Sequence, residues 1–222
     1  MIRADLHLHT VYSGDSNTSL EQVIARCLDI GINCIAITDH NTIEGAVKMQ
    51  RIAPFQVIVG DEIQTSSGEI IGYFLSEEVP KGLPAEETAR RIKEQGGLVC
   101  IPHPFDRLRS CTIRRQTLEE ILPSVDIIEV LNSRLILLRY SVRAERFAQA
   151  HGLLASAGSD AHTPGEIGNA YMEMPSFNGT DQFLTSLAQG RVMGHRTAPW
   201  THLQSTWVKL VKQLRVTRPN SA

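Results

Sequence analysis

The sequence predicts an α/β protein of one domain, with a mostly parallel sheet that forms either a barrel or an open doubly wound sheet. Short apolar runs alternate with amphipathic helical patterns along almost the whole chain, as in successive strand–helix units. The chain has no internal repeat, no low-complexity tract and no linker long enough to separate two domains. Its 222 residues, 42% of them hydrophobic, are enough for one full-sized core.

Eight short apolar runs are predicted to be strands. They are residues 2–7, 34–38, 57–59, 69–74, 98–101, 127–130, 154–157 and 171–174. Only residues 64–68 separate the fourth run from the segment before it, which predicts a local hairpin instead of a crossover helix.

Amphipathic helices are predicted between the strands. The clearest spans residues 20–28, whose apolar side chains follow one helix face. Thr18 with Glu21 fits a capping box at the start of this helix, and Gly31 is predicted to end it. Further helices are predicted at residues 43–52, 85–95, 117–122, 139–151 and 180–189.

The end of the chain predicts one more helix. After Pro199, the residues Trp207, Val211 and Leu214 lie on one apolar stripe. We therefore expect a main domain over residues 1–196, with residues 197–222 forming a helical extension and short tail of the same domain.

Composition excludes several classes of protein. The net charge of −2 disfavours a protein whose main task is to coat nucleic acid or an anionic membrane. No apolar stretch has the length of a signal peptide or a transmembrane helix, so we expect a cytoplasmic location and no membrane partner. Four cysteines stand apart without a CxxC pair and are predicted to be buried reduced thiols: Cys27, Cys34, Cys100 and Cys111.

Six of the predicted strands end in side chains that can bind metal. These are Asp5, His7 and His9 after the first strand, Asp39 and His40, Asp61 and Glu62, His103, Glu129, and Asp160 with His162. Alternation points residues 5, 7 and 9 to the same side of their strand. The ends of parallel strands share one edge of the sheet, where α/β enzymes build their sites.

Such a set predicts a metal site. One histidine at a strand end is more often structural than a metal ligand. Six strands that all end in metal-binding side chains are, however, improbable as a coincidence. Imidazoles mixed with carboxylates, without thiolate, suit Zn, Mn or Fe better than Mg or Ca. About nine candidate ligands exceed the three that a mononuclear zinc enzyme uses, so two or three divalent ions are expected.

Five motifs resemble the PHP superfamily, named for polymerase and histidinol phosphatase domains. They are DLHLHT (5–10), ITDH (37–40), GDE (60–62), HPF (103–105) and GSDAH (158–162), and they occur in the family's order. The resemblance runs from residue 2 to about residue 194. It implies a distorted (β/α)7 TIM-like barrel and a phosphoesterase with a two- or three-metal site.

The resemblance also implies a role for each motif residue. His7, His9, Glu62 and Asp160 would bind one ion, Asp15, His40 and His162 a second, and Glu62 with His103 a third. Asp39 would orient His40 or a nucleophilic water. Many family members have a further histidine between the GxE and HP motifs, and this chain has none from residue 41 to residue 102. Glu69 or Glu129 is expected to complete the third site instead.

The implied mechanism is in-line attack on phosphorus by a metal-bridging hydroxide. Arg107 and Arg134 follow strand ends on the active face and are expected to bind the phosphate, with Arg109 as a further candidate. His195 is expected to protonate the leaving alkoxide or to touch a phosphate.

Four functions are compared on this basis. The favoured one is hydrolysis of a small phosphomonoester or nucleotide phosphate. The second is an exonuclease acting on oligonucleotide ends, for which Lys209, Lys212, Arg215 and Arg218 are the available basic residues. A non-catalytic regulatory module is disfavoured because nearly all ligands are present. A C–N hydrolase of the amidohydrolase type is disfavoured because no lysine ends a strand. No oligomeric state is predicted.

Overall fold

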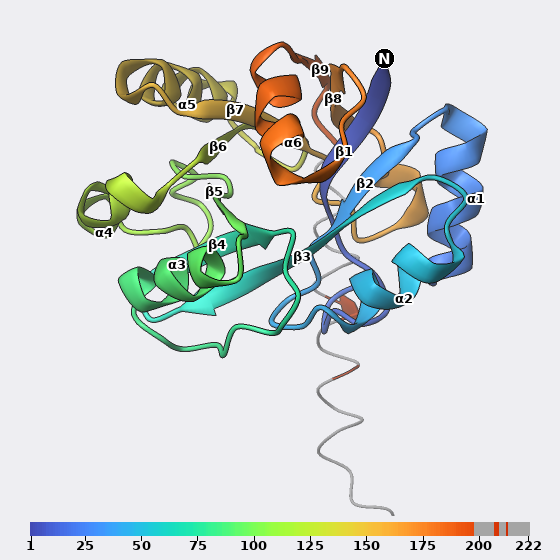
Figure 1. Ribbon diagram of the computed structural model, residues 1–222, viewed down its shortest axis with the longest axis horizontal. Helices are drawn as coiled ribbons and strands as arrows, with labels where there is room; N and C mark the ends of the chain where they lie inside the picture. Colours follow the sequence, from blue (N-terminus) through green and yellow to red (C-terminus); the bar gives the residue numbers. More distant parts are fainter. Residues whose placement is uncertain (198–206, 209–211, 213–222) are drawn as a thin grey trace, which may run out of the picture.

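A single sheet curls into a nearly closed barrel in the computed structural model, which describes residues 1–197, 207–208 and 212 (Figure 1). Within residues 1–197 the nine strands lie in the order β7-β6-β5-β4-β3-β2-β1-β8-β9. The strands are β1 (Ile2–Leu8), β2 (Cys34–Ile37), β3 (Gln56–Thr65), β4 (Gly68–Tyr73), β5 (Leu98–Ile101), β6 (Ile127–Asn132), β7 (Leu154–Gly158), β8 (Ala170–Met174) and β9 (Arg191–Gly194).

Helices cover the outside of this sheet. Figure 1 shows α1 and α2 beside β2 and β3, and α3, α4 and α5 around the other half of the barrel. The helices are α1 (Leu20–Ile30), α2 (Glu44–Ile52), α3 (Ala85–Glu94), α4 (Arg115–Ile121), α5 (Leu138–His151) and α6 (Gly179–Ala188), with short 3-10 turns η1 (Leu122–Ser124) and η2 (Pro164–Glu166). The predicted α/β barrel is therefore confirmed.

The expectation of a mostly parallel sheet needs correction. β1, β2 and β3 pair in parallel, as do β5, β6 and β7, but β4 is antiparallel to both of its neighbours, and so is β8. The turn between β3 and β4 is too short for a crossover, which confirms the predicted hairpin. The connection from β7 to β8 contains only η2, whereas a parallel return needs a dozen residues or more and usually a helix.

Three local predictions were also inexact. β3 continues to Thr65, well beyond the apolar run at 57–59, and β9 was not predicted. The capping box of α1 is formed by Ser19 and Gln22, one residue later than expected, while Gly31 ends the helix at φ 74° as predicted. The predicted C-terminal helix falls mainly on residues outside the described part of the chain.

β7 meets β1 at the seam of the barrel. Leu8 and Ala161 form a parallel bridge, and the N–H of Asp160 donates to the carbonyl of His7 (2.6 Å). The Asp5 carboxylate accepts hydrogen bonds from the N–H groups of Ser159 (2.8 Å) and Gly168 (3.0 Å). Asp5 therefore holds β1 to the segment after β7, which sets His7 opposite Asp160.

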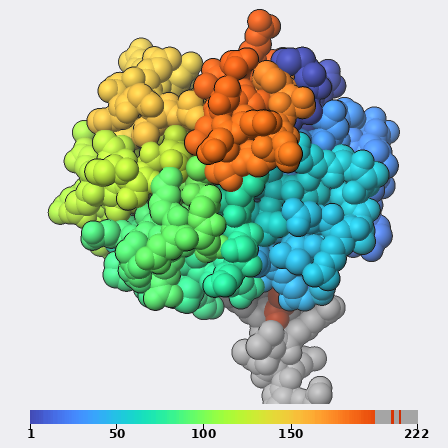
Figure 2. All heavy atoms as spheres, in the orientation of Figure 1, coloured from blue at the N-terminus to red at the C-terminus, as the bar shows by residue number. Residues whose placement is uncertain are grey.

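Apolar side chains alternate between two clusters. On β2, Cys34 and Ala36 belong to the cluster inside the barrel, while Ile35 and Ile37 belong to the cluster under the outer helices. Tyr73 donates to the carbonyl of Leu6 across the barrel (2.8 Å). Phe183 of α6 packs edge-on against Tyr73, so α6 closes one end of the barrel. In Figure 2 the orange segment that contains α6 lies at the upper centre of the visible face.

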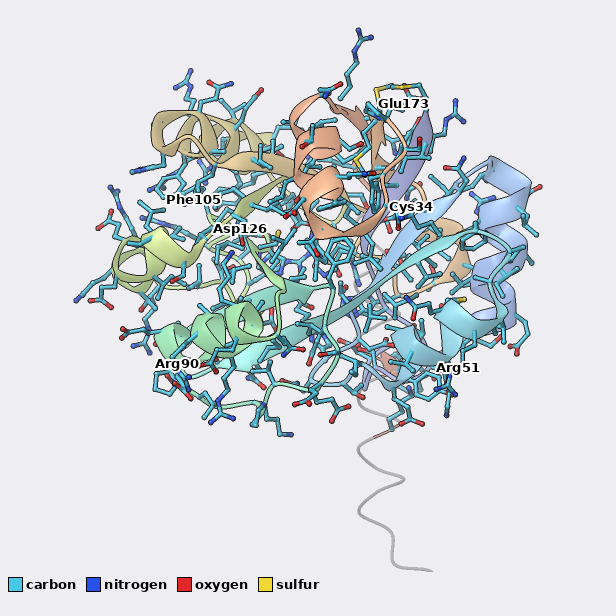
Figure 3. The ribbon with its side chains drawn as sticks, in the orientation of Figure 1. Cys34, Arg51, Arg90, Phe105, Asp126 and Glu173 are labelled. Atoms are coloured by element: carbon cyan, nitrogen blue, oxygen red, sulfur yellow. The ribbon has the colours of Figure 1, made fainter. Side chains whose placement is uncertain are left out.

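Phe105, labelled in Figure 3, belongs to the cluster under the outer helices. Phe105, just after β5, packs edge-on against Phe147 of α5 with ring centroids 5.4 Å apart. The guanidinium of Arg143 lies 4.4 Å from the centre of the Phe105 ring. This packing fixes the start of the loop that leaves β5 toward the open end of the barrel. None of the helices in the described ranges is long and apolar enough to cross a bilayer.

Candidate metal centre

Histidines and carboxylates from six strands meet at the open end of the barrel. A pocket of about 510 Å³ opens there, lined among others by Asp15, His40, Glu62, Glu69, Asp160 and His162. Asp15, His40, Asp160 and His162 follow the C-terminal ends of β1, β2 and β7. Glu62 is inside β3, which extends far enough to bring it beside His40.

The first group gathers around His7 and His9. His7 Nε2 lies 3.2 Å from His9 Nε2, 3.5 Å from Glu62 Oε2 and 3.8 Å from Asp160 Oδ1. His9 Nε2 lies 3.3 Å from the same Glu62 oxygen and 3.4 Å from the same Asp160 oxygen. All four residues are buried.

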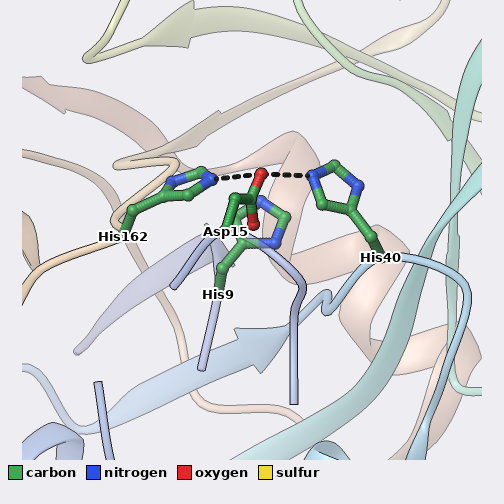
Figure 4. A group of neighbouring side chains, drawn as sticks. All are labelled: His9, Asp15, His40 and His162. Atoms are coloured by element: carbon green, nitrogen blue, oxygen red, sulfur yellow. Dashed lines mark hydrogen bonds and ion pairs between the residues drawn. The ribbon is translucent and has the colours of Figure 1, made fainter. Parts of the chain in front are cut away.

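The second group gathers around Asp15, as Figure 4 shows. Asp15 Oδ2 lies 3.2 Å from His40 Nε2 and 3.2 Å from His162 Nε2, and His9 lies close behind. Asp15 comes from the turn after β1. The structure thus brings together the three residues expected to share an ion.

Glu62 joins the groups. Its Oε2 is 3.2 Å from His40 Nδ1, and its Oε1 is 3.2 Å from His103 Nε2. Glu69 lies near both histidines, with Oε2 at 3.8 Å from His103 Nε2 and Oε1 at 3.7 Å from His40 Nδ1. Of the two carboxylates considered for the third site, Glu69 therefore has the matching position.

Glu129 has other contacts. One of its oxygens lies 2.9 Å from His7 Nδ1, and the other accepts hydrogen bonds from the His103 N–H (2.8 Å) and the Asn132 amide (3.0 Å). Asn132 also donates to Asp160 Oδ2 (3.1 Å). These contacts place Glu129 behind the ligand candidates and not among those of the third site.

Three residues at or beside the pocket have backbone conformations that favour glycine. Asn41 and Asp160, which line the pocket, have φ 60° and 54°, and the neighbouring His103 has φ 32°. Such conformations cost energy and are found where a site requires them. Glu166 supports the same region, because its Oε2 accepts hydrogen bonds from the N–H groups of His162 and Thr163 (3.0 Å each). The sequence analysis missed Glu166, although its spacing from Thr163 matches a capping box.

Asp39 is buried and faces the turn after β1. Its Oδ1 accepts the N–H of Thr10 and its Oδ2 accepts the Thr10 hydroxyl, both at 2.6 Å. Both oxygens are thus engaged by Thr10 instead of by the His40 ring that Asp39 was expected to orient. The contact anchors the turn that carries Asp15.

The expected phosphate-binding residues separate into two sets. Arg134 and Arg109 line the pocket, and Arg109 Nη1 pairs with Asp160 Oδ2 (2.7 Å). Arg107 is exposed and lines a neighbouring pocket instead. His195 is also exposed, directly after β9, and its Nδ1 lies 3.2 Å from the carbonyl of Arg196. Arg109 thus has the place at the pocket that Arg107 was expected to have.

Cysteine burial was predicted correctly for three of four residues. Cys27, Cys34 and Cys100 are buried, whereas Cys111 is half-buried and lines the metal-ligand pocket. Its loop follows β5 and carries no strong apolar pattern, so the sequence offered no signal for this position.

Electrostatics favour positive charge at the centre. Burial lowers the pKa of His7, but the carboxylates of Glu129, Glu62 and Asp160 outweigh it and raise the pKa well above its usual value. Burial likewise lowers the pKa of His40, and Glu62 and Asp15 raise it to about 10. The pocket therefore stabilises a cation placed among these side chains.

Comparison with known proteins agrees with this geometry. The PHP domain model matches residues 5–122 and the PHP-associated model residues 141–192. Uncharacterized protein MJ1587 of Methanocaldococcus jannaschii is 46% identical over 117 residues, covering 47% of this chain and 68% of that protein. Uncharacterized protein MJ0417 of the same organism is 36% identical over 180 residues, covering 80% of this chain and 72% of that protein.

Solved structures share the fold at low identity. A two-domain protein from Bacteroides vulgatus, containing a predicted PHP-like metal-dependent phosphoesterase, has a TM-score of 0.66 at 18% identity over 87% of this chain and 65% of that chain. The lesion-specific endonuclease EndoQ from Pyrococcus furiosus has a TM-score of 0.61 at 16% identity over 89% of this chain and 59% of that chain. This chain spans less than two thirds of either protein. Because one family model covers more than half of the chain and the second relative matches most of it, the chain belongs to the PHP domain family.

Proposed function

We propose that this protein is a metal-dependent phosphoesterase that holds two or three divalent transition-metal ions and hydrolyses a small phosphomonoester or nucleotide phosphate. His7, His9, Glu62 and Asp160 hold one ion, and Asp15, His40 and His162 a second. Glu62 and His103, with Glu69, hold the third. Mn²⁺, Zn²⁺ and Fe²⁺ suit such mixed nitrogen and oxygen ligands.

The spacing of the ligand atoms carries this proposal. Ligands at about 2.0–2.2 Å around a tetrahedral ion stand roughly 3.3–3.6 Å from one another. The measured separations around His7 and His9 run from 3.2 to 3.8 Å. Two imidazole nitrogens that face each other at 3.2 Å, with carboxylates on both sides, have the arrangement of ligands around a common cation.

Unpartnered atoms support the same conclusion. Among the described residues, Asp15 Oδ1 and Glu69 Oε2 are buried without a hydrogen-bond partner. A buried carboxylate oxygen without a partner is costly unless a ligand satisfies it. The donor set of the pocket therefore fits divalent cations.

The divalent ions supply Lewis acidity, which activates water and neutralises charge on phosphoryl oxygens. The protein's own groups do the rest. Arg109 and Arg134 border the pocket and present guanidinium N–H donors to a phosphate. Glu129 holds His7 so that Nε2 faces the pocket. Nδ1 of His162 lies 2.8 Å from the carbonyl oxygen of Asp160 and 2.5 Å from Arg134 Nη1, so its Nε2 faces Asp15.

Elemental analysis and activity test the proposal together. Protein reconstituted with Mn²⁺, Zn²⁺ or Fe²⁺ in turn is expected to hold about two to three equivalents and to hydrolyse members of a phosphomonoester panel. Chelation should abolish hydrolysis and added metal restore it. His7→Ala and Asp160→Ala should each lose at least ~100-fold in activity while remaining folded. No more than about one equivalent of bound metal would contradict the multi-metal site.

One observation favours an oligonucleotide as a second candidate substrate. A pocket of about 370 Å³ adjoins the first and shares Arg109 with it; its other basic residues are Arg107, Arg114, Arg115 and Arg143. Arginines next to a phosphate-cleaving centre suit the neighbouring phosphates of a nucleic-acid strand. Short oligonucleotides therefore belong in the substrate panel, and cleavage faster than that of any monoester would favour this candidate.

A further inference from the structure

Cys111 is the cysteine that reaches the metal-ligand pocket. It lies in the loop between β5 and α4 and lines the pocket with Glu62 and Glu69. Its Sγ, a carboxylate oxygen of Glu69 and a ring nitrogen of His103 all lie within 4.8 Å of one another. The other three cysteines are fully buried in the core.

Glu69 supplies an independent sign of a ligand. Its side chain is 8% exposed, and its Oε2, the oxygen that lies 3.8 Å from His103 Nε2, has no hydrogen-bond partner in the part of the chain that the structure describes.

Backbone contacts hold Cys111 opposite Glu69. The N–H of Glu69 donates to the carbonyl of Cys111 (2.8 Å), and the N–H of Arg114 donates to the carbonyl of Ser67 (3.0 Å). Gly68 allows this approach, because a Cβ there would lie 2.3 Å from Cα of Ile113. The loop and the β3–β4 hairpin are therefore locked together, and the thiol is placed by main-chain geometry.

We infer that Cys111, Glu69 and His103, with Glu62 as the bridging fourth ligand, form a thiolate-containing site that selects Zn²⁺. This inference rests on the proposed metal centre and names the ligands of its third ion. A soft thiolate favours Zn²⁺ over Mn²⁺ or Mg²⁺, while the all-nitrogen-and-oxygen groups around His9 and Asp15 lack this preference. The ion binds as the thiol releases its proton to solvent, so a Zn–S bond replaces an S–H bond without oxidation.

Co²⁺ provides a spectroscopic test on the whole protein, since it takes the ligands of a zinc site. Metal-free protein titrated with Co²⁺ is expected to develop the near-ultraviolet charge-transfer absorption of a cobalt–thiolate bond. Cys111→Ser should lose this absorption and about one equivalent of Zn²⁺, and keep the remaining metal. Ser110→Ala changes the neighbouring pocket residue and is the matched control. It should keep the cobalt–thiolate absorption and the full Zn²⁺ content.

Alkylation of the thiol gives a second test that needs no variant. Zn²⁺ is expected to slow modification of Cys111 by about tenfold or more, read by peptide mass spectrometry, because a metal-bound thiolate is masked. Co²⁺ bound without thiolate absorption, or alkylation unaffected by Zn²⁺, overturns this inference and leaves the proposed phosphoesterase intact. Failure of the protein to bind any transition metal would instead overturn the proposed function.

Discussion

Glu129 Oε1 lies 2.9 Å from Nδ1 of His7, while the opposite nitrogen of the same ring faces Glu62 and Asp160. The second Glu129 oxygen accepts from the N–H of His103 and from the Asn132 amide. The buried carboxylate of Glu129 on β6 thus positions His7 of β1 and His103 after β5, which lie far apart in the sequence.

Glu129→Gln should lower metal affinity by about 10- to 100-fold and leave activity at saturating metal within a few-fold of wild type. Glutamine has one acceptor oxygen, whereas Glu129 accepts from His7, His103 and Asn132. The change in metal affinity is measured from the rate of hydrolysis as a function of free metal concentration. Glu119→Gln, on the exposed face of α4, is the control and should behave as wild type. Equal metal dependence for the two variants would exclude this role for Glu129.

Gly158→Ala should destabilise the barrel by roughly 1–3 kcal/mol and displace His7. A Cβ at residue 158 would lie 2.3 Å from Cβ of His7 and 2.6 Å from its backbone nitrogen. Urea unfolding and phosphatase assays measure the two effects. Gly165→Ala has open space and an ordinary φ, so it should leave both unchanged. If Gly158→Ala left stability and activity unchanged, the backbone between β1 and β7 would have to shift to make room for the added methyl group.

Arg134→Met should raise KM for a small phosphomonoester by about 10- to 100-fold and change kcat little, if the guanidinium grips the phosphate equally in ground and transition states. Arginine cannot ligate a cation, but Arg134 Nη1 contacts Nδ1 of the candidate ligand His162, so metal content is measured in the same samples. A rise in KM at unchanged metal content would assign the effect to phosphate binding. Arg107→Met is the matched control, since Arg107 lies outside the metal-ligand pocket. Thermal melting checks that both variants fold. If only Arg107→Met raised KM for small substrates, the phosphate would bind in the second pocket and not beside Arg134.

Asp61→Asn should flatten the pH dependence of stability in chelator-treated protein. Asp61 is fully buried, neither oxygen has a hydrogen-bond partner among the described residues, and burial raises its pKa to about 8. The folded state therefore retains a proton that the unfolded state releases near pH 4. This stabilisation is present below pH 4 and is lost as pH rises toward 8.

Between pH 5 and pH 8, the free energy of unfolding of the wild type should therefore fall by about 3–4 kcal/mol relative to that of Asp61→Asn. Urea titrations at several pH values measure the difference. Parallel stability curves would show that Asp61 is charged in the folded protein. Asp126→Asn and Asp29→Asn are unsuitable as controls, because Lys93 and Arg26 pair with these residues. Asp181→Asn is suitable, because Asp181 is exposed and forms no ion pair among the described residues.

Particular residues show how far sequence reasoning reached. Alternation along β1 placed His7 and His9 on one face, and the shared edge of the strands placed Asp160 near them; both follow from local periodicity. Glu62 was expected at a strand end and lies inside a longer β3, because the hairpin partner β4 extends the pairing to Thr65. Arg107 and Arg109 were not distinguishable by spacing, since the loop after β5 has no periodic pattern.

The sequence by itself determined the α/β class, the positions of most strands along the chain and the histidine–carboxylate set at the strand ends. These depend on hydrophobic periodicity and on chemistry that each residue carries wherever it lies. Only the tertiary structure decided that Glu129 supports His7, that Asp39 anchors Thr10, and that Cys111 stands beside Glu69 and His103. Those relationships join residues distant in the chain, and they depend on how the barrel closes and how its loops pack.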